Sequence, residues 1–134
     1  MSLVIQYHNV RLWRCYERLN VAINALNECS SQLQRAITWR QVEIVQRMLI
    51  RQQDNMLLVK QEAIIWRQVV AESGQEHPLI QKLDQEIERK MQTLNINHQT
   101  VCNLIMDYVS DCKCCLIKKL AVVFNCRKKI ESPG

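Results

Sequence analysis

Apolar residues recur along the first half of the chain at alternating spacings of four and three residues. One such seam runs from Leu12 to Ile37, and a second runs from Val45 to Val70. β-Strands would alternate at period two, so this spacing predicts heptad α-helices that pack side by side. The register slips once, between Ile37 and Val42. Such a slip either changes the supercoil locally or marks a break between two helices.

A short loop is predicted at 73–77. Gly74 suits a helix C-cap, and Pro78 suits the first turn of the helix that follows. The return segment then repeats the spacing of three and four residues from Leu79 to Val123. Because so short a connection joins antiparallel neighbours, the return segment is expected to fold back on the segment before it.

Polar clusters predict two further breaks. The first is expected within 27–38, where Ser31 and Thr38 each have a glutamine three residues later, the spacing of a capping box. The alternative is one very long helix that contains both residues. The second is expected in the polar stretch 95–98. With Asn9 as the first N-cap, the predicted helices are about 10–28, 31–73, 78–95 and 98–129.

The composition favours an all-α fold. The 134 residues include two Gly and two Pro, too few for the turns of an all-β or a doubly wound α/β fold. We expect one domain over 1–134, an antiparallel long-helix hairpin or helical bundle assembled as a dimer. No run of 18 apolar residues exists, so no transmembrane helix is expected. The short apolar start and the odd count of seven Cys predict a cytoplasmic or nuclear protein that is not secreted.

The two seams lead to the first functional hypothesis, a protein–protein interaction and self-assembly module. They are longer than one short return helix can cover, and apolar residues lie on several sides of the chain around 42–50. A homo-oligomer, such as a dimeric four-helix arrangement, would bury them. The residues assigned to this self-assembly seam are Leu12, Tyr16, Leu19, Ile23, Leu26, Leu33, Ile37, Val42, Val45, Leu49, Met56, Val59 and Trp66.

A second hypothesis, nucleic-acid binding, comes from the charge distribution. Residues 1–53 carry seven Arg against three Glu, whereas residues 54–112 carry five basic and nine acidic side chains. On a single straight helix, six of these arginines would share an arc of about 100°, suited to the phosphates of duplex RNA. The alternative is a solvated face, or pairing with the acidic face at 84–88. The candidates are Arg11, Arg14, Arg18, Arg40, Arg47 and Arg51.

The C-terminal segment 112–134 supports a third hypothesis, peripheral membrane contact. Neighbouring cysteines, basic residues and the apolar run 120–124 are typical of a reversibly acylated amphipathic helix that meets anionic headgroups. The alternative is that these cysteines are buried in a bundle as small hydrophobic residues. The membrane candidates are Cys114, Cys115, Lys118, Lys119, Arg127, Lys128 and Lys129.

No metal, cofactor or small-molecule substrate is expected. His98, Cys102, Cys112 and Cys115 offer four zinc ligands. On one continuous helix, however, Cys102 and Cys112 are ten residues and about 15 Å apart. The four side chains could therefore not bind the same ion within one chain. Two Gly cannot form a Gly-rich phosphate loop, and the HExxH and GxSxG motifs are absent. The sequence therefore predicts a protein that is not an enzyme.

Overall fold

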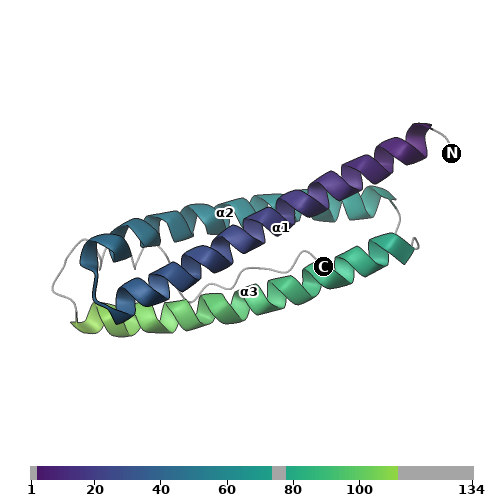
Figure 1. Ribbon diagram of the computed structural model, residues 1–134. Helices are drawn as coiled ribbons and strands as arrows, with labels where there is room; N and C mark the ends of the chain where they lie inside the picture. Colours follow the sequence, from purple (N-terminus) through teal and green to yellow (C-terminus); the bar gives the residue numbers. More distant parts are fainter. Residues whose placement is uncertain (1–2, 74–77, 112–134) are drawn as a thin grey trace.

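Three long helices make up the part of the chain described by the computed structural model, which is residues 3–73 and 78–111. They are α1 (Leu3–Thr38), α2 (Val42–Ser73) and α3 (Pro78–Asp111), packed together lengthwise (Figure 1). The all-α class predicted from the spacing is confirmed. The predicted end of one helix at Ser73 and start of the next at Pro78 are confirmed as well.

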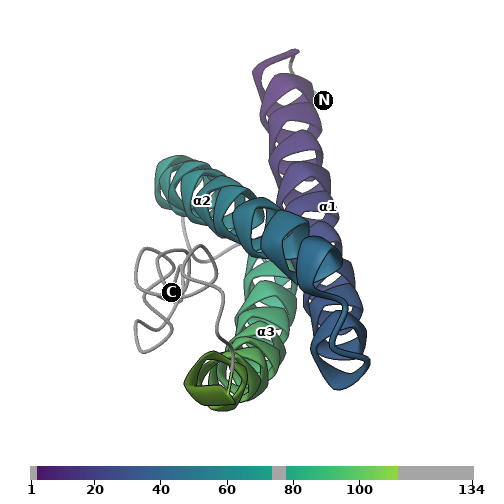
Figure 2. The same ribbon diagram turned by 90° about the vertical axis from the view of Figure 1, so that its left-hand side faces the viewer.

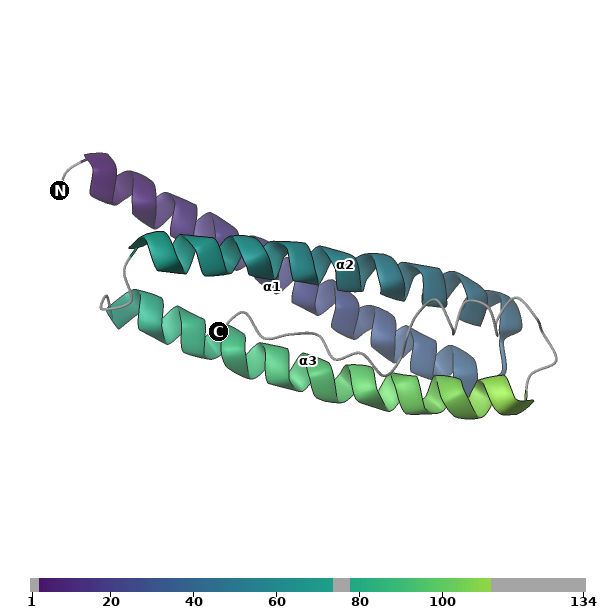
Figure 3. The same ribbon diagram turned by 180° about the vertical axis from the view of Figure 1, so that it is seen from behind.

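Helix α1 is the element on which the other two pack. Side-chain hydrogen bonds join α1 to α3 at Tyr16–Glu86 and Asn27–Asn97, and both pairs are separated by 70 residues. A constant separation means that α1 and α3 run parallel and in register. Helix α2 is antiparallel to both, and it approaches α3 much less closely than it approaches α1. Viewed from the end of the bundle, α2 crosses over α1, and α3 lies below α2 (Figure 2). The reverse view shows α1 passing obliquely behind α2, with its C-terminal half between α2 and α3 (Figure 3).

The break between α1 and α2 falls at residues 39–41, and its backbone hydrogen bonds explain it. The N–H of Arg40 donates to the carbonyl of Ile37 at 3.1 Å, and that of Gln41 donates to Ala36 at 2.9 Å. With Arg40 at a φ of 52°, this is a Schellman closure of the helix C-terminus. The N–H of Val45 then donates to the carbonyl of Gln41, which starts α2.

The break expected within 27–38 was therefore wrong, as was the single helix 31–73. The hydroxyls of Ser31 and Thr38 do not cap new helices. They donate to the carbonyls of Asn27 and Gln34, four residues earlier in the same helix, at 3.2 and 2.8 Å. Serine and threonine can make such bonds inside a helix without ending it. The slip in heptad register between Ile37 and Val42 was the correct signal.

Two other predicted helix limits were also wrong. Helix α1 begins at Leu3, so Asn9 lies within it instead of capping it. Helix α3 continues without interruption through 95–98 to Asp111. There the amide of Asn97 donates to Asn27 of α1 at 2.9 Å, a contact between helices. The predicted helical portion beyond residue 111 and the tail 112–134 lie outside the described residues.

The heptad seams form the core inside one chain. Of the thirteen residues assigned to a self-assembly seam, all except Tyr16 and Val42 are buried between the three helices. For these eleven residues the assignment is corrected, since buried side chains cannot meet a second molecule. A short return helix was expected, whereas α3 has 34 residues. With 36, 32 and 34 residues, the three helices are nearly equal in length, so each seam can be covered within the chain.

Candidate interaction surface

The six arginines proposed for nucleic-acid binding do not lie on one continuous helix. Arg11, Arg14 and Arg18 belong to α1, whereas Arg47 and Arg51 belong to α2, which runs in the opposite direction. Arg40 lies in the turn between the two helices. Arg11 makes an ion pair with Glu72 of α2, while the side chains of Arg14, Arg18, Arg47 and Arg51 are exposed. The prediction that all six arginines share one helix face required one straight helix and was wrong. The arginines instead form separate groups on α1 and α2.

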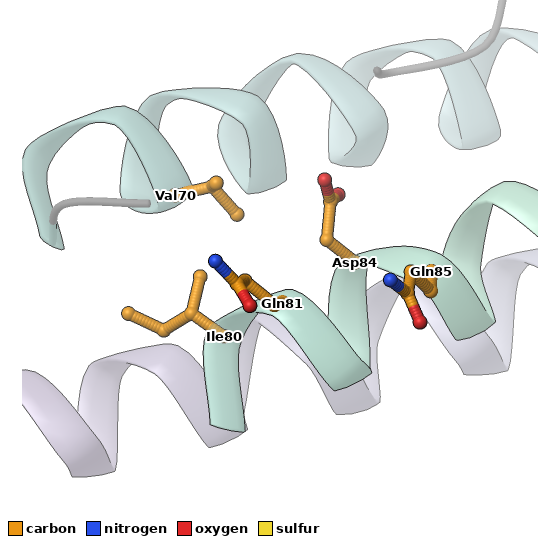
Figure 4. A pocket seen from close by; sticks show the side chains of 5 residues that line it. All are labelled: Val70, Ile80, Gln81, Asp84 and Gln85. Atoms are coloured by element: carbon orange, nitrogen blue, oxygen red, sulfur yellow. The ribbon is translucent and has the colours of Figure 1, made fainter. Parts of the chain in front are cut away.

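A shallow cleft lies between one end of α2 and the start of α3. Its lining residues are Val70 of α2 with Ile80, Gln81, Asp84 and Gln85 of α3 (Figure 4), and its volume is about 430 Å³. The carboxylate of Asp84 accepts a hydrogen bond from the indole Nε1 of Trp66 at 3.0 Å. This hydrogen bond joins α2 to α3 beside the cleft.

Three cysteines of the described residues, Cys15, Cys29 and Cys102, are buried and form no disulfide with one another. The Sγ of Cys102 lies 3.5 Å from Nε2 of His98, one turn away on α3, and both residues are buried. Burial raises the pKa of the Cys29 thiol, which donates to the carbonyl of Met48. Within 3–73 and 78–111 there is no group of three or more His, Cys, Asp or Glu that could hold a metal ion. Cys112 and Cys115 fall outside that part of the chain.

The proposed membrane residues, Cys114 through Lys129, also lie outside the described residues. Among the helices that are described, none has the length and apolarity needed to cross a bilayer.

A polar cluster links the three helices near Trp66. Tyr16 of α1 lies 5.9 Å from the Trp66 ring, centroid to centroid, and its hydroxyl donates to Oε2 of Glu86 at 2.5 Å. Lys90 Nζ donates to Asn20 Oδ1 at 2.6 Å and lies 5.7 Å from the centre of the Tyr16 ring. Burial, followed by the bond to Glu86, raises the pKa of Tyr16. The same bond is the main reason that the pKa of Glu86 is lowered.

These two shifts predict a pH window for the Tyr16–Glu86 bond. The stabilisation is expected above the ordinary Glu pKa of 4.5 and to be lost as pH falls through the lowered pKa of Glu86. At the other end it is expected to be complete below the ordinary Tyr pKa of 10.0 and to be lost as pH rises through the raised pKa of Tyr16. Tyr16→Phe should therefore lower the Tm most between these limits, measured by circular dichroism.

Glu86→Gln is the matched control for this prediction, because it keeps an acceptor at position 86 but cannot titrate. The difference in Tm between Glu86→Gln and the double variant Tyr16→Phe/Glu86→Gln should not change as the pH falls below neutral. If Tyr16→Phe shifted the Tm equally at about pH 7 and at a pH low enough to protonate Glu86, the proposed coupling would be wrong.

A row of uncharged side chains on the outer side of α2 is the most unusual exposed feature of the bundle. It consists of Ile50, Gln53, Leu57, Gln61 and Ile64, and we call it the α2 outer stripe. All five are exposed, and the three apolar ones are exposed by 51%, 56% and 58%. At 100° per residue the five fall within an arc of about 80° centred on Leu57. The buried Trp66, nine residues on, lies about 180° from Leu57 around the helix axis.

The stripe was not identified from the sequence, although its signal was present. Ile50, Leu57 and Ile64 are seven residues apart with Gln between them. The apolar residues on several sides of the chain around 42–50 include only Ile50, the first residue of the stripe. The core seam of α2 uses a different set of positions, including Val45, Gln52 and Val59, all of which are buried. Once that seam is assigned to the core, the α2 outer stripe can be recognised as a second heptad row.

No protein-family model, curated protein sequence or solved structure matches this chain.

Proposed function

We propose that this protein is a helical self-assembly module that forms a homodimer through the α2 outer stripe and has no catalytic role. The observation that supports this proposal is the row of exposed Ile and Leu at heptad spacing, free of charged residues, on the face of α2 that points away from the core. Solvent-facing positions of a helix in a monomer are usually polar or charged. Exposed apolar residues that share one helix face are typical of interaction sites.

The inner seam is compatible with this use of the outer face. Val45, Val59 and Trp66 are fully buried between α2 and its neighbours, so α2 is held in place without a partner. A preformed helix loses little conformational freedom on binding, and rigid surfaces therefore associate at lower entropic cost. Self-assembly through α2 does not require the three-helix bundle to open.

Sedimentation equilibrium of the full chain tests the proposal. Concentrations from about 1 to 100 µM bracket binding free energies of roughly 5 to 8 kcal/mol. The expected result is a mass rising towards twice the 15.8 kDa of one chain. A monomer over the whole range would overturn the proposal.

Duplex RNA in a parallel sample separates the remaining hypothesis from this one. A complex that forms only with RNA and weakens steeply as salt rises would favour nucleic-acid binding by the arginines instead. Self-association through apolar side chains should persist without RNA and depend little on salt.

A further inference from the structure

The α2 outer stripe reads the same in both directions. Around Leu57, Gln53 and Gln61 lie four residues away, and Ile50 and Ile64 lie seven away. The next turn continues the symmetry, with Gln46 and Gln68 eleven residues from Leu57. Over these 23 positions the row contains Gln, Ile and Leu and no charged residue. At 1.5 Å per residue it is about 33 Å long.

Such a palindrome is what an antiparallel pair of identical helices needs. A two-fold axis runs perpendicular to two antiparallel helices. It places a residue that lies a given number of positions before the axis in one copy level with the residue that lies the same number of positions after the axis in the other copy. With the axis at Leu57, Leu57 meets Leu57, Ile50 meets Ile64, and Gln53 comes level with Gln61. Every layer then pairs apolar with apolar or amide with amide.

We propose that the partner of the α2 outer stripe is the same stripe of a second copy, in antiparallel orientation and with the two-fold axis at Leu57. This inference rests on the proposed self-assembly and specifies its geometry. The partner's three helices would lie on the far side of its own α2, because the core seam is on the opposite face of that helix.

The helix dipoles favour the antiparallel orientation. Two neighbouring helices that run in opposite directions place the positive end of each dipole beside the negative end of the other. Asp54 and Lys60 lie about 60° to either side of Leu57 around the helix axis. They therefore border the stripe on opposite edges and are not part of its contact row.

Charge substitutions at Ile50 and Ile64 test both the surface and the orientation. Ile50→Glu and Ile64→Lys should each weaken dimerisation by about 100-fold, because each places one unpaired charge in each of the two symmetry-related apolar layers. The double variant Ile50→Glu/Ile64→Lys should recover at least about tenfold, since each Glu then faces a Lys of the other copy. The two positions are fourteen residues apart on one helix, so they cannot pair within a chain.

Ile50→Glu/Ile64→Glu is the matched control, with the same number of charges and no complementary pair. It should stay monomeric at concentrations where the Glu/Lys variant dimerises. Both positions are exposed in the single chain, so all variants should keep the wild-type helicity and Tm at monomer concentrations.

The outcomes separate this inference from the function on which it rests. A wild-type dimer with no recovery in the Glu/Lys variant overturns the antiparallel geometry and leaves self-assembly standing. A wild-type dimer unaffected by either single substitution overturns the surface. A monomeric wild type overturns self-assembly and this inference together.

Discussion

Replacing Trp66 by alanine is expected to lower the free energy of unfolding by about 3–5 kcal/mol. Trp66 is the largest fully buried side chain, with 0% of its surface exposed. It also contacts both neighbouring helices, through the Tyr16 ring of α1 and the Asp84 carboxylate of α3. Because α2 and α3 otherwise approach each other only slightly, the loss removes both a large apolar contact and a main link between them. Urea denaturation followed by circular dichroism measures the effect.

Trp39→Ala is the matched control, since Trp39 lies in the turn after α1 with 75% of its surface exposed. Its removal should change the free energy of unfolding by no more than about 0.5 kcal/mol. If the two substitutions cost the same, Trp66 does not have the central packing role described above.

Ser30→Ala is expected to destabilise the protein by about 1–3 kcal/mol, far more than the loss of one small side chain would suggest. Ser30 Oγ accepts a hydrogen bond from Nε2 of Gln52 at 2.7 Å, across the α1–α2 interface. Both residues are buried, and the other polar atom of Gln52, Oε1, has no hydrogen-bond partner among the described residues. Without Ser30, a buried amide would lose the partner of its N–H group too.

The double variant Ser30→Ala/Gln52→Leu should recover this loss and reach at least the wild-type stability. Removing both partners leaves no unsatisfied polar group, and a seam of apolar residues then continues through position 52. Ser31→Ala serves as the control, because its exposed hydroxyl bonds only to the carbonyl of Asn27 in the same helix. A double variant less stable than Ser30→Ala would show that the Gln52 side chain is needed for another reason.

The spacing of apolar residues was sufficient to predict the helices and most of their buried faces. Leu19, Leu26, Val45 and Trp66 were placed on packed seams from periodicity alone, and all four are buried. Periodicity works here because burial on one helix face is what the pattern records. It does not identify the molecule that covers the face, so residues of the core were assigned to contacts between subunits.

Helix ends were predicted less well, for reasons that local chemistry explains. Ser31 and Thr38 are good N-cap residues, yet in the structure their hydroxyls donate within α1. The true end of α1 has Arg40 at the left-handed position where glycine is usual, so composition gave no warning of it. The outer stripe was missed because two heptad rows alternate along the sequence of α2. Only the structure shows which row is buried and which is exposed.

The constant separation of 70 residues between α1 and α3 has a consequence for how the chain folds. Helices α1 and α2 are joined by three residues, so their first contacts close a very short loop, whereas every contact between α1 and α3 closes a long one. Loop closure costs more entropy as the loop lengthens, and non-local contacts form late. The α1–α2 hairpin is therefore the natural nucleus, and α3 docks onto it afterwards. Synthesis from the N-terminus favours the same order, because the hairpin leaves the ribosome before the helix that completes its core.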